Sequence, residues 1–162
     1  MSPSRKLLVF GGVSLAALGM LYGLHYAVFV EHQTLNQMGT SLAQAFGQAA
    51  ERRMPEAESS VGTYAATKYN YVRQVDVHSH WIGLAMLLII LGVAFDSVAF
   101  VEPVRLWMAG ALLVGSVCFP LGVILQTFTH GAAFASGLAI GGSALVTISL
   151  AGVAWGFGRK MA

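Results

Sequence analysis

Five histidines are the residues of this chain best suited to chemistry, and the apolar segments around them predict where they gather. Membrane-spanning segments carry few ionisable side chains, and those that they carry usually have a function. Imidazole nitrogens bind both heme iron and copper. The topology predicted below places all five histidines toward one end of a membrane-spanning bundle, which indicates a metal or heme site near one membrane surface. They are His25, His32, His78, His80 and His130.

The spacing of the histidines limits which of them can share one site. His25 and His32 are seven residues apart, so on a helix they share a face but lie about 10 Å apart along its axis. On a continuous helix, His78 and His80 point about 200° apart and would serve two sites. On an extended segment both would point to one side and could chelate one ion with Asp76. The sequence leaves these two alternatives open.

The composition places the chain in a lipid bilayer. The chain is 56% hydrophobic and 10% charged, whereas soluble domains carry about 25% charged residues. Its net charge of +2 gives no reason to expect a nucleic-acid partner. Four apolar runs are each long enough to cross a hydrocarbon core of about 30 Å as a helix. We therefore predict one all-α domain, an integral membrane four-helix bundle. Its spans cover about residues 7–30, 81–101, 106–128 and 132–157.

The segment of residues 31–79 is too long for a simple connection between the first two spans. Apolar residues recur at helical spacing on both sides of Pro55, which predicts an amphipathic helical hairpin. Such a hairpin would cover a cofactor, dock a partner or cap the bundle. The apolar positions are Leu35, Met38, Leu42, Phe46 and Ala49 before the proline, and Val61, Ala65, Tyr69, Val72 and Val75 after it.

The positive charges predict the orientation. Cytoplasmic loops of membrane proteins are enriched in Lys and Arg close to the ends of the spans. Five such residues fall on one side of the predicted bundle, so we expect both termini to be cytoplasmic in a bacterial inner membrane. The segment 31–79 and the histidine end would then be periplasmic. The five residues are Arg5, Lys6, Arg105, Arg159 and Lys160.

Other polar and small residues predict how the helices pack. Asp96 near the cytoplasmic end of the second span is expected to pair with Arg105, with Glu102 sharing the arginine. Pro120 should kink the third span and free a backbone carbonyl near Ser116. Two small-xxx-small pairs would let helix backbones approach closely. They are Gly19 with Gly23, and Gly137 with Gly141.

The run from His78 to Met86, HSHWIGLAM, resembles the His-x-His start of an apolar span in certain small four-helix membrane proteins. These proteins are similar to fragments of the main subunit of heme-copper oxidases, chiefly the cbb3-type. In that subunit a His-x-His helix places one histidine on each of two hemes. The resemblance therefore implies that His78 and His80 are axial heme ligands. It does not imply oxygen reduction, because we find no counterpart of the oxidase copper ligands.

These observations favour a membrane redox protein that binds heme b near the periplasmic face, with His25, His78, His80 and His130 as candidate ligands. A heme iron takes one or two imidazoles on opposite ring faces, and His80 with His25 is the first choice of pair, with His130 as the alternative partner. The protein would transfer electrons between the quinone pool and a periplasmic carrier, or serve as a subunit of a respiratory complex.

Two alternatives remain open at this point. A copper-binding membrane protein would use the same four histidines together with Asp76. A cofactor-free accessory or assembly subunit would dock a larger membrane complex through the hairpin. The chain has no nucleophile–base motif that would indicate a hydrolase.

Overall fold

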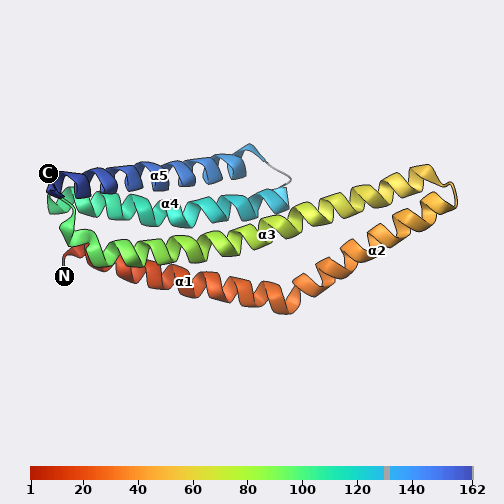
Figure 1. Cartoon of the computed structure of the whole chain (residues 1–162), viewed down its shortest axis with the longest axis horizontal. Coiled ribbons are helices and arrows are strands. Elements are labelled where there is room, and N and C mark those ends of the chain that lie inside the picture. The colour runs from red at the N-terminus through yellow and green to blue at the C-terminus, as the bar shows by residue number, and fades with distance from the viewer. Residues whose placement is uncertain (130–131, 162) are drawn as a thin grey trace. The chain divides into compact units, whose positions relative to one another are not determined.

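The computed structural model describes residues 1–129 and 132–161, and these residues form an all-α structure. The α-helices are α1 (Pro3–Phe29), α2 (Glu31–Ala50), α3 (Met54–Ala94), α4 (Glu102–Thr129) and α5 (Ala133–Met161), with a short 3-10 helix η1 (Phe95–Ser97) after α3 (Figure 1). By length and composition, α1, α4, α5 and the apolar part of α3 could each cross a membrane. The all-α class and the four long apolar helices are thus confirmed.

The second predicted span is part of a longer helix and ends earlier than expected. Helix α3 runs for 41 residues without a break through the hairpin segment and the apolar run. It ends at Ala94 rather than near residue 101, and Val98 is already extended, with φ −73° and ψ 124°. The predicted end was wrong because the chain leaves the α-helix after Ala94 and passes through η1 into an extended connection, in which some of the apolar residues pack against the bundle. Phe95 and Val98 are buried, and the Ala99 N–H donates to the Gly156 carbonyl at 3.1 Å.

The described chain divides into two compact units. Unit 1 comprises Met1–Met20 and Val77–Ala162, and unit 2 comprises Leu21–Asp76. In unit 1 the start of α1 and the last turn of α5 lie at the same end of the bundle (Figure 1). This end carries the basic residues that the sequence analysis grouped on one side of the membrane.

Glycines bring α4 and α5 into close contact in unit 1. A Cβ atom on Gly115 would lie 2.8 Å from the Gly142 carbonyl oxygen, and one on Gly142 would lie 2.8 Å from the Phe119 Cα atom. A Cβ on either Gly137 or Gly141 would meet no atom of another described element within 4 Å. The predicted pair in α5 therefore does not line this contact; α5 approaches α4 through the adjacent Gly142.

Helices α1 and α3 of unit 1 also approach closely at glycines. A Cβ on Gly12 would lie 3.0 Å from the Ala85 carbonyl oxygen, and one on Gly19 would lie 3.1 Å from the Trp81 Cβ atom. The prediction that Gly19 serves close packing is confirmed. The neighbouring side chains Trp81, Ala85 and Leu88 are buried.

A polar network ties α1, η1 and α4 together at the end of the bundle near the termini. Asp96 pairs with Arg5 at 3.3 Å and, less closely, with Arg105 at 3.9 Å. Arg105 pairs with Glu102 at 2.7 Å. The second oxygen of Glu102 accepts a hydrogen bond from the Ser4 N–H at 2.8 Å and so caps an unpaired donor at the start of α1. The predicted acid–arginine group is present, and Arg5, which the sequence analysis had not included, is the nearer partner of Asp96.

Helix α4 continues through Pro120. Because proline has no N–H, the helix lacks the hydrogen bond that would normally reach the Ser116 carbonyl. The Ser116 side chain is fully buried, and its hydroxyl has no hydrogen-bond partner among the residues that the structure describes. Pro120 is also fully buried, so it takes part in the packing of the bundle.

Unit 2 contains a helical hairpin built from α2 and the first part of α3, which run antiparallel (Figure 1). The turn between them is tight: Arg52 has a left-handed φ of 59°, and the Arg53 N–H donates to the Gln48 carbonyl at 2.8 Å. Within the hairpin, the buried residues of α2 and of the first part of α3 are small, namely Ser41, Ala45, Ala57 and Thr67.

Candidate functional site

His78 is held in a defined orientation by the backbone of α1. Its Nδ1 lies 2.9 Å from the Gly19 carbonyl oxygen. Because a carbonyl oxygen can only accept, Nδ1 carries the proton, and in the neutral ring Nε2 then has a free lone pair. Histidines that bind metals typically donate their other ring N–H to a carbonyl or carboxylate in this way. The His78 ring is therefore oriented as a metal-binding imidazole would be.

His80 contacts a different helix. Its ring meets the Phe119 ring of α4 edge-on, with a centroid distance of 4.7 Å and an interplanar angle of 74°. Both histidines lie inside the continuous helix α3, so the alternative with an extended segment is wrong. His78 contacts α1 and His80 contacts α4. The two rings therefore point toward different helices and are not arranged to bind one ion together.

The remaining candidate ligands lie elsewhere in the chain. His25 is exposed, and its ring centroid is 5.5 Å from that of Phe29. Asp76 belongs to unit 2, like His25, and lines a groove along α3. His130 lies outside the described residues. His32, which was not included among the candidate ligands, is exposed and contacts Asn36.

Within residues 1–129 and 132–161, no group of three or more His, Cys, Asp or Glu side chains could hold a metal ion. The described residues therefore lend no support to a multidentate copper site, and copper binding stays a prediction. A heme differs in what it needs from the protein, because one imidazole nitrogen is enough to hold its iron. The donor that fits this requirement is Nε2 of His78.

Unit 2 contains a group of tyrosines, two of them hydrogen-bonded, that was not predicted from the sequence. The Tyr22 hydroxyl donates to Gln74 Oε1, and the Tyr71 hydroxyl donates to Glu31 Oε1 at 3.3 Å. The Tyr26 ring is buried and lies 6.4 Å from the Tyr71 ring. The sequence signal was the helical spacing: Tyr22 and Tyr26 are four residues apart, and Tyr71 and Gln74 are three apart.

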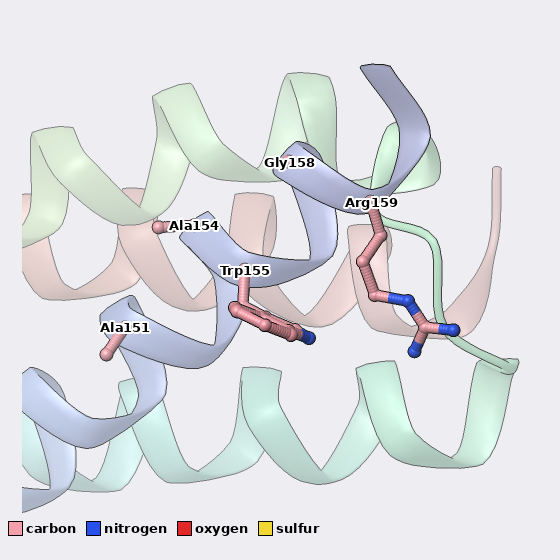
Figure 2. Close-up of a pocket in the computed structure, with 5 residues that line it drawn as sticks. All are labelled: Ala151, Ala154, Trp155, Gly158 and Arg159. Atoms are coloured by element: carbon pink, nitrogen blue, oxygen red, sulfur yellow. The ribbon is translucent and has the colours of Figure 1, made fainter. Parts of the chain in front are cut away.

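A groove runs along α5 near its C-terminal end (Figure 2). It has a volume of about 600 Å³ and is open on one side. Three small residues line it together with Trp155 and Arg159, whose side chains project from the same side of the helix. Tryptophan and arginine near a helix end are typical of the membrane–water interface. The small residues are Ala151, Ala154 and Gly158.

Five surface grooves of the described residues have volumes between about 310 and 770 Å³, and none of these five is lined by a histidine. The feature of His78 that suits a cofactor is therefore the orientation of its ring with its free donor atom, not a cavity beside it.

No protein-family model, no curated protein and no solved structure matches this chain. The resemblance of residues 78–86 to the oxidase subunit consequently stays a prediction.

Proposed function

We propose that this protein is a membrane redox protein that binds heme b at the His78 end of its bundle. When bound, the heme supplies reversible one-electron chemistry at iron. The observation that supports the proposal is the hydrogen bond from His78 Nδ1 to the Gly19 carbonyl. This bond fixes the ring and leaves Nε2 as the ligand.

His80 has a separate role in this proposal. It lies on the same helix as His78 but is turned toward α4. It would therefore bind a second heme, or contact the same heme from another direction. His25 and His130 stay candidate ligands, as the sequence predicts. Electrons would pass between membrane quinone and a periplasmic carrier, or to the other subunits of a respiratory complex. We further propose that the protein resides in a bacterial inner membrane with both termini in the cytoplasm, as the basic residues at the terminal end indicate.

The test is the absorption spectrum of the intact protein, purified in detergent from heme-supplied cells. The expected result is a Soret band that shifts on reduction with dithionite and is lost in His78→Gln. The matched control is His32→Gln, because His32 is exposed and its ring contacts only Asn36 among the interactions described.

Elemental analysis of the same samples separates the alternatives. A colourless protein with a fixed ratio of copper atoms to protein chains would show that the cofactor is copper and not heme. A protein that contains neither heme nor copper would favour the remaining alternative, a cofactor-free accessory subunit. A Soret band that survives in His78→Gln would refute the role given to this residue.

A further inference from the structure

One side of the hairpin in unit 2 presents large apolar side chains to its surroundings. A groove of about 340 Å³ on this side is lined by residues of both helices. Phe46 is 69% exposed and Met54 is 55% exposed. Leu42 and Val61, which also line the groove, are exposed as well. We call these four residues, together with Leu35 and Val72, the apolar face.

The hairpin leaves these side chains outside because its own contact is made by small residues. Ser41 and Ala45 of α2 are buried, as is Ala57 of α3. Small residues allow two helices to approach closely, so they leave no room between the helices for leucine or phenylalanine. A pair of helices that buries alanine and exposes phenylalanine gains little from the hydrophobic effect on its own. The apolar face therefore requires a cover.

The sequence of α2 argues against lipid as that cover. A helix that lies on a membrane surface usually carries Lys or Arg on its polar side, where these residues meet anionic headgroups. Helix α2 (Glu31–Ala50) contains neither Lys nor Arg, and its first turn carries Glu31. The two cations of the adjoining part of α3, Lys68 and Arg73, lie over the rings of Tyr64 and Tyr69 of the same helix. The groove itself is flanked by Glu58. A protein partner suits this surface better than a headgroup layer.

We infer that the apolar face is covered by the apolar face of a second copy of this chain, so that two hairpins form a four-helix bundle. Copies in one bilayer share one orientation, and a twofold axis along the membrane normal therefore brings identical residues to the same height. Two helices about 30 Å long and about 20 Å wide in total offer roughly 600 Å² of face. This approaches the area of about 800 Å² per partner that specific interfaces bury.

The charges at the tip of the hairpin favour the same partner. Both signs occur within a few residues of the groove. Glu51 pairs with Arg53 of the same chain at 2.8 Å, and a twofold arrangement brings the acids of one copy to the height of Arg52 of the other. The tip is close to neutral and does not oppose self-association. Its charged residues are Glu51, Arg52, Arg53, Glu56 and Glu58.

Thiol cross-linking in membrane vesicles tests this inference on the full chain. The background is Cys118→Ser, since Cys118 is the one cysteine of the sequence. Leu42→Cys and Val61→Cys each place a thiol on the apolar face. The matched controls are Gln44→Cys and Thr63→Cys, because a shift of two residues turns a side chain by about 200° on the helix. A short bis-maleimide reagent is expected to give a covalent dimer from the first two variants and monomer from the controls.

A second measurement distinguishes the loss of the dimer from a loss of folding. Phe46→Glu should convert the detergent-purified dimer to monomer in light scattering, while Gln44→Glu stays dimeric and both keep the helical content of the parent. Monomer in all four cysteine variants, equal cross-linking on both sides, or cross-linking to a different protein would each overturn the inference. Lipid cover would also overturn it, and would appear as thiols at Leu42→Cys and Val61→Cys that water-soluble maleimide cannot reach while lipid-soluble maleimide can. Heme content plays no part in either readout, so this inference stands or fails independently of the proposed function.

Discussion

Two adjacent glycines in α5 offer a direct test of how the bundle packs. A methyl group at Gly142 would lie 2.8 Å from the Phe119 Cα atom and 3.0 Å from the Cys118 carbonyl carbon. Both are backbone atoms of α4, which cannot move aside as a flexible side chain would. A methyl group at Gly141 would meet nothing within 4 Å. Gly142→Ala should therefore destabilise the protein, and Gly141→Ala should not.

The size of the difference follows from two effects of opposite sign. Alanine in place of glycine favours a helix by up to about 1 kcal/mol, and this gain is available at both positions. Overpacking a tight contact costs about 1–3 kcal/mol, and this cost arises only at Gly142. We expect a net loss of about 2 kcal/mol for Gly142→Ala against Gly141→Ala, which corresponds to roughly 4–8 °C in Tm for a chain of this length.

The assay is thermal unfolding of the two variants and the parent in the same detergent, followed by circular dichroism. A lower Tm for Gly142→Ala beside an unchanged or raised Tm for Gly141→Ala is the expected result. Equal values for the two variants would show that α4 and α5 are not held together at Gly142, and the packing described above would have to be abandoned.

Three further outcomes follow from the structure. Glu102→Ala should speed hydrogen exchange of the Ser4 amide in the first turn of α1, since the carboxylate that accepts its hydrogen bond is removed; unchanged exchange would refute the capping role. Ala45→Leu should destabilise the hairpin by about 1–3 kcal/mol because it overpacks a buried position, whereas Ala43→Leu on the exposed side should not, and trypsin sensitivity of the hairpin turn reports the difference. In bilayers with brominated lipid chains, the fluorescence of Trp155 as the sole tryptophan should be quenched strongly and that of Trp81 weakly, because they are 69% and 4% exposed; equal quenching would contradict the assignment of faces.

Much of the architecture could be predicted because the signals are local. Apolar runs of sufficient length predicted the four long helices, and helical spacing around Pro55 predicted the two helices of the hairpin. The end of α3 could not be predicted in this way. Val98 is apolar because it is buried in a connection, and a hydropathy pattern does not distinguish a buried connection from a further turn of helix.

The candidate site shows a similar division. Sequence spacing restricted His78 and His80 to two alternatives, and the continuity of α3 decided between them. Only the tertiary structure shows what each ring contacts: the Gly19 carbonyl for His78 and the Phe119 ring for His80. Both partners lie on other helices, far away in the sequence.

The amino-acid sequence alone determined that this chain is helical, apolar enough for a bilayer and charged at one end. The tertiary structure decided which side of each helix meets another helix. Gly141 and Gly142 illustrate the reason, since they are neighbours in sequence but only one of them approaches α4. In a membrane, lipid and neighbouring helices are both apolar, so hydrophobic pattern cannot separate a lipid-facing side from a packed side. That distinction depends on shape, which arises only when the helices are placed against one another.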